Sequence, residues 1–76
     1  MRLRAVLAKN VRRLRGRRGL SQEQLAQLSE LTRNYISNIE LEQYAATVDV
    51  VEQLAVALGV TPGQLLDPDL DVNAAG

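Results

Sequence analysis

Cysteine, histidine, tryptophan and phenylalanine are all absent from this chain of 76 residues, and tyrosine occurs only twice. Without cysteine and histidine there is no disulfide framework, no thiol chemistry, no zinc site of the usual kind and no imidazole base. Long apolar runs are also missing, which excludes a signal-peptide core in the first residues and a membrane-spanning segment. We therefore expect a cytoplasmic protein that has no membrane contact, no metal and no cofactor.

Catalytic constellations are missing as well. The chain has no glycine-rich phosphate loop and no cluster of carboxylates placed for acid–base work, so an enzyme is excluded. Glu40 stands alone, and we expect it to form a structural hydrogen bond or ion pair with an arginine of the first helix. Asp67, Asp69 and Asp71 alternate like the opening of a calcium loop, but Val72 stands where that loop requires glycine.

Charge is unevenly distributed, although the formal net charge is zero. Eight of the nine basic residues lie within residues 1–18, whereas all nine acidic residues lie after residue 18. Such an order predicts a domain with a positive side and a negative side, and the positive side suits a phosphate backbone. A solvated helix face that binds nothing is the alternative interpretation of the same arginines.

Helical spacing and capping residues predict the first three helices. Apolar residues of helical period, from Leu3 to Leu14, predict a helix over residues 2–17, with Gly19 in a left-handed cap. Ser21, with glutamine three residues later, forms a capping box for a second helix whose buried side includes Leu28. Residues 29–32 form a turn, and Thr32 caps a third helix over residues 33–40.

The second half of the chain predicts two more helices. Thr47 opens a fourth helix that ends near Leu58, with Val48 at the start of its buried stripe. Thr61 opens a short fifth helix through a second capping box. We therefore expect an all-α, compact five-helix domain over residues 1–68 and a flexible tail over residues 69–76. The helix-turn-helix unit spans about residues 21–40.

The fourth helix has more apolar surface than one buried face needs. A deeply buried helix and a dimer surface are both consistent with this excess. A chain this short buries only roughly 60% of its unfolded surface, so a second copy would add stability. The residues expected at a homodimer interface are Val50, Val56, Ala57, Val60 and Leu65.

The third helix is divided into an apolar face and a polar face. Ile36 and Ile39 point one way, and the opposite face presents Arg33, Asn34, Ser37 and Asn38. A guanidinium, two carboxamides and a hydroxyl are groups that hydrogen-bond base edges in the major groove of DNA. This face is therefore the candidate site for reading sequence in double-stranded DNA.

The ordered motifs resemble the Cro and phage-repressor-like (Xre-type) helix-turn-helix family, which includes restriction–modification controller proteins. The resemblance rests on G-L-S-Q-E-Q-L-A at 19–26, Y-I-S-N-I-E at 35–40 and L-A-V-A-L-G-V at 54–60, after a basic first helix. It implies five helices, binding of an operator by a homodimer, and a third helix placed in the major groove. It leaves a small-molecule effector unspecified.

The resemblance also assigns roles by position. The residues expected to approach bases are Thr32, Arg33, Asn34, Ser37 and Asn38. The residues expected at phosphates are Ser21, Gln22, Tyr35, Gln43 and Tyr44, to which the uneven charge adds the first-helix arginines Arg12, Arg13 and Arg17. We expect Arg33→Ala to relax sequence preference and Arg13→Ala to weaken binding to all DNA alike.

Three positions depart from the family pattern. Glu30 and Glu42 stand where glycines are common, and Ala46 stands where proline is common. A glutamate in the left-handed conformation costs roughly 1 kcal/mol. Glu42 also brings a carboxylate to a loop that should follow phosphates. These glutamates leave open an alternative function, a protein-interaction module such as an antitoxin or an anti-repressor partner on the same scaffold.

Overall fold

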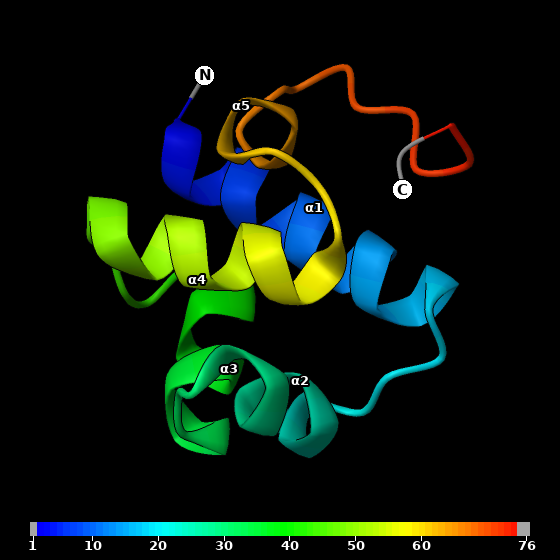
Figure 1. The fold of residues 1–76 in the computed structure, drawn as a ribbon. Helices are drawn as coiled ribbons and strands as arrows, with labels where there is room; N and C mark the ends of the chain where they lie inside the picture. The colour runs from blue at the N-terminus through cyan, green and yellow to red at the C-terminus, as the bar shows by residue number, and fades with distance from the viewer. Residues whose placement is uncertain (1, 75–76) are drawn as a thin grey trace.

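Five helices surround one apolar core in residues 2–74, the part of the chain that the computed structural model describes. They are α1 (Leu3–Arg17), α2 (Gln22–Ser29), α3 (Arg33–Glu40), α4 (Val48–Leu58) and α5 (Pro62–Leu65). In Figure 1, α4 crosses in front of α1. Helices α2 and α3 lie below α4, and α5 lies above it. The predicted all-α five-helix fold is confirmed. No helix within residues 2–74 has the length and apolar character needed to cross a membrane.

Side-chain caps open the helices from α2 onward. The Ser21 hydroxyl accepts from the amide of Gln24 at 3.0 Å, and the Gln24 side chain accepts from the Ser21 amide at 2.8 Å. The hydroxyls of Thr32, Thr47 and Thr61 likewise cap α3, α4 and α5, and Thr61 forms a second capping box with Gln64. These contacts satisfy amides that a helix start leaves without partners. The predicted caps are therefore confirmed.

Every helix contributes to the core. The fully buried side chains include Leu14 of α1, Leu25 of α2, Ile36 of α3, Leu54 of α4 and Leu65 of α5. Burial of such side chains is the main favourable contribution to the stability of a domain of this size.

Three leucine and valine positions that helical spacing assigned to the core are exposed instead. Leu3 and Val48 are each the first residue of a helix, and their side chains are exposed. Leu28 of α2 is exposed in a shallow hollow that it lines together with Gln53 and Val56 of α4. The prediction was wrong at these positions because helical spacing identifies a face but not how far the packed partners extend.

A buried asparagine ties the end of α5 to α1. The amide nitrogen of Asn10 donates to the carbonyl oxygens of Leu65 at 2.9 Å and Asp67 at 2.8 Å. These bonds satisfy carbonyls that a helix end leaves open. The contacts fix α5 although that helix has only four residues.

The segment after α5 contacts the core rather than standing clear of it. Leu70 is buried in the core, and Val72 packs against it half-buried. The flexible tail was expected over residues 69–76, of which 75–76 lie outside the described residues, as does Met1. The domain boundary at residue 68 stays a prediction.

Candidate nucleic-acid interface

The third helix is divided as its sequence predicts. Ile36 and Ile39 are buried against α1 and α2, whereas Arg33 and Asn34 are exposed and Ser37 is half-buried. The hydroxyl of Thr32 accepts from the amide of Tyr35 at 3.1 Å, so this residue caps the helix at the end where the outward face begins. The outward face of α3 is thus polar, accessible and fixed at its start.

The two carboxamides on this face are not equivalent. The side-chain nitrogen of Asn38 donates to the backbone oxygen of Asn34 at 2.9 Å, one turn earlier on the same helix. Asn38 is also half-buried, whereas Asn34 is exposed. Asn34 therefore has its donor and acceptor pair directed outward, and Asn38 has part of its capacity occupied by its own helix.

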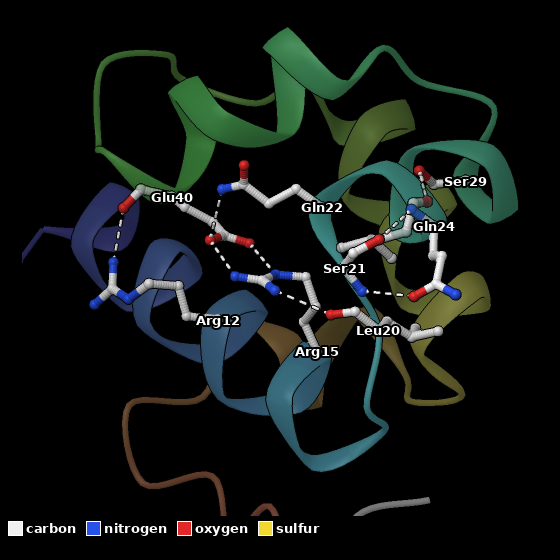
Figure 2. A network of polar contacts seen from close by, with 9 residues as sticks. Arg12, Arg15, Leu20, Ser21, Gln22, Gln24, Ser29 and Glu40 are labelled. Carbon is white, nitrogen blue, oxygen red and sulfur yellow. Dashed lines mark hydrogen bonds and ion pairs between the residues drawn. The ribbon is translucent and has the colours of Figure 1, made fainter.

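Glu40, the last residue of α3, lies at the centre of a polar network (Figure 2). The side chain of Glu40 is 5% exposed and receives Arg15 at both oxygens, Nε to Oε2 at 2.7 Å and Nη2 to Oε1 at 2.9 Å. Gln22 Nε2 donates to the same Oε1 at 3.2 Å. Arg12 Nη1 donates to the backbone oxygen of Glu40 at 2.7 Å. The expected ion pair between Glu40 and the first helix is confirmed.

This network raises the pKa of Arg15, chiefly through the hydrogen bond to Glu40, with the carboxylate charge adding to the effect and burial opposing it. Arg15 Nη1 also donates to the carbonyl of Leu20 at 3.0 Å. One guanidinium thus joins α1, the α1–α2 connection and the C-terminal end of α3. Three hydrogen bonds from one charged group tie the C-terminal end of α3 and the α1–α2 connection to α1.

Several residues expected at phosphates gather around α3. Arg12 and Gln22 lie at its C-terminal end through their contacts with Glu40. The rings of Tyr35 and Tyr44 form an edge-to-face pair with centroids 5.3 Å apart, so packing accounts for part of the role of both. The backbone amide of Gln43 donates to the carbonyl of Asn38 at 2.8 Å, which keeps the following loop against the helix end.

Two expected phosphate residues lie on a different side of α1. Arg13 and Arg17 are exposed and follow Asn10 by three and seven residues, so they share its side of the helix. Asn10 contacts the end of α5, whereas Arg12 and Arg15 contact the end of α3. The structure therefore does not bring Arg13 and Arg17 together with the other expected phosphate residues.

The two departures at glycine positions have the conformation that glycine would adopt. Glu30 has φ 61° and Glu42 has φ 63°, both left-handed. Arg2 Nη2 lies 3.1 Å from Glu42 Oε1, so the residue that precedes α1 supplies a cation to a loop that has none of its own. Sequence reasoning missed this pair because nothing local links positions 40 residues apart.

The five residues expected at a dimer interface do not form one surface. Leu65 is fully buried and Val50 nearly so within the same protomer, and neither has surface to offer a second copy. Ala57 and Val60 are half-buried, and Val56 is 77% exposed. The expected interface is thereby reduced to Val56 and its two half-buried neighbours.

Comparison with known proteins agrees with this geometry. The helix-turn-helix family HTH_3 matches residues 11–65. A hypothetical transcription factor of Neisseria meningitidis is 46% identical over 66 residues, which are 87% of this chain and 62% of that protein. The chain thus spans less than two thirds of that relative. The control protein C.SmaI of Serratia marcescens is 41% identical over 66 residues, 87% of this chain and 79% of that protein. The crystal structure of the restriction-modification controller protein C.AhdI from Aeromonas hydrophila superposes with a TM-score of 0.78 at 36% identity, covering 84% of this chain and 96% of that one.

Proposed function

Because this chain belongs to the HTH_3 helix-turn-helix family, a class of non-enzymatic DNA-binding transcription regulators, we propose that it binds a two-fold symmetric operator as a homodimer. In this proposal α3 enters the major groove. The observation that carries the proposal is the outward face of α3, which is polar and accessible while its far end is anchored by the nearly buried Glu40. A rigid helix with such a face is what a helix-turn-helix protein uses to read bases.

Base reading is assigned first to Arg33 and Asn34. The exposed guanidinium of Arg33 can donate two hydrogen bonds to O6 and N7 of guanine, and the carboxamide of Asn34 can pair with N6 and N7 of adenine. Thr32, Ser37 and Asn38 border these two side chains and adjust which neighbouring bases fit.

Phosphate contacts are assigned to the residues around α3. These residues are Arg12, Ser21, Gln22, Tyr35, Gln43 and Tyr44. Ser21 and Gln22 also lie at the start of α2, where free amides favour an anion. Arg13 and Arg17, on the other side of α1, strengthen the positive field without a fixed contact.

The reading role of Arg33 is tested by comparing two exposed arginines. We expect Arg33→Ala to lower affinity for a specific duplex about tenfold or more, since a bidentate pair discriminates by about 1–3 kcal/mol, and to leave a scrambled duplex nearly unaffected. Arg17→Ala is the matched control and should weaken both duplexes slightly and equally. Fluorescence anisotropy at fixed salt measures both. Equal losses on the two duplexes for Arg33→Ala would refute the reading role.

Dimerisation is proposed because one α3 reads few base pairs, and two copies on half-sites about 34 Å apart extend the site. The contact between copies is placed around Val56, with Ala57 and Val60 beside it. We expect Val56→Glu to convert the dimer to monomers in sedimentation velocity. Val48 is 85% exposed on the same helix but outside the proposed contact, so Val48→Glu is the matched control and should leave the dimer intact. A dimer that survives Val56→Glu would place the interface elsewhere.

A further inference from the structure

Leu41 is a large apolar side chain exposed at the end of the reading helix. It is 63% exposed, and its amide donates to the carbonyl of Ser37 at 3.0 Å. Leu41 is the C-cap of α3, and this i to i−4 hydrogen bond to Ser37 keeps its backbone nitrogen in register with the last turn of the helix. Leu41 is not among the residues that the sequence analysis assigned to bases or phosphates.

Helical geometry places Leu41 on the outward face of α3. It follows Ser37 by four residues and Asn34 by seven, and side chains at these intervals lie on one side of a helix. Ile36 and Ile39, by contrast, point into the core. Leu41 therefore extends the polar reading face by one apolar group, and its own chain does not cover it.

We propose, resting on the proposed function, that Leu41 contacts the C5-methyl group of a thymine in each half-site. The edges that bases display in the major groove are hydrogen-bond donors and acceptors, and the methyl group of thymine is the apolar exception. An exposed leucine one turn beyond Ser37 and two turns beyond Asn34, on the same side of α3, meets this group when α3 lies in the groove.

Neighbouring contacts favour this occupant over a second copy of the chain. A second copy seated on Leu41 would lie on the side of α3 that also carries Ser37 and Asn34, which the proposed function assigns to DNA. Glu42, which follows Leu41, is paired with Arg2 at 3.1 Å. The cation of Arg2 offsets the charge of this carboxylate. The carboxylate of Glu42 therefore repels a DNA backbone near Leu41 less strongly than an unpaired carboxylate would.

The test removes single methyl groups from DNA. A duplex selected from a random pool by the full-length wild-type protein is remade with deoxyuridine in place of each thymine in turn, symmetrically in both half-sites. Anisotropy titration should reveal one position at which the wild-type protein loses about fourfold in affinity per half-site, the loss expected for one methyl group. Leu41→Ala should bind the thymine and uracil duplexes equally. Leu3→Ala changes a leucine of similar exposure, 61%, on α1 and should keep the wild-type sensitivity.

Each contrary outcome overturns the inference in a distinguishable way. A wild-type protein that is indifferent to every uracil replacement, or a selected half-site without thymine, refutes the role of Leu41 and leaves operator binding intact. Uracil sensitivity that persists in Leu41→Ala assigns the methyl group to another residue. A protein that binds no duplex in the pool refutes the proposed function, and the role of Leu41 with it.

Discussion

Release of backbone strain at Glu30 is the prediction that the structure defines best. Glu30 ends α2 with φ 61° and ψ 33°, and the amide of Leu31 donates to the carbonyl of Ala26 at 2.9 Å across this turn. A residue with a Cβ atom pays about 1–2 kcal/mol in this region, and glycine does not. Glycine also makes the unfolded chain more flexible, which removes about 0.4–1 kcal/mol of that gain. We expect Glu30→Gly to raise the free energy of unfolding by about 0.5–1 kcal/mol.

The side chain of Glu30 gives no reason to expect a compensating loss. It is exposed, and the described residues form no hydrogen bond or ion pair with it. A gain of that size in a domain this small corresponds to a rise in Tm of roughly 3–6 °C. Thermal and urea unfolding followed by circular dichroism measure both quantities.

Two further variants isolate the backbone effect. Glu30→Ala removes the charge but keeps a Cβ atom, so it should give little of the gain. Gly59→Ala is the reverse experiment, since Gly59 has φ 73° and an added Cβ would lie 2.7 Å from Nη2 of Arg18; it should lower stability. Equal stability of Glu30→Gly and Glu30→Ala would refute the strain argument. Glu42→Gly should gain less than Glu30→Gly because it also breaks the pair with Arg2.

Two other changes test the contacts that hold the helices in place. Glu40→Ala leaves the largely buried Arg15 without its carboxylate. It should lower the free energy of unfolding, measured by urea titration, by about 3 kcal/mol. A loss below about 1 kcal/mol would indicate that the network contributes little. Asn10→Ala removes both hydrogen bonds to the end of α5 and should cost about 2 kcal/mol, with faster amide exchange in residues 62–70 than elsewhere; uniform exchange would contradict a local role.

Helix order, helix starts and the two faces of α3 could be predicted from the sequence. Ser21 with Gln24, and Thr61 with Gln64, bond across a single turn, so the contact depends on dihedral angles that those few residues determine themselves. The spacing of Ile36 and Ile39 on α3 fixes which face is buried for the same reason. The family motifs combined these local signals into the correct fold.

The placement of long-range partners depended on tertiary structure. Glu40 meets Arg15 across 25 positions, Arg2 meets Glu42 across 40, and no local pattern selects these partners from eight arginines and lysines in the first helix region. Tertiary structure also determines which apolar residues stay exposed, as Leu41 and Val48 do. Local spacing determines the direction of a side chain relative to its own helix. How helices cross depends on the fit of all core side chains together. The crossing then determines whether a given side chain contacts another helix or solvent.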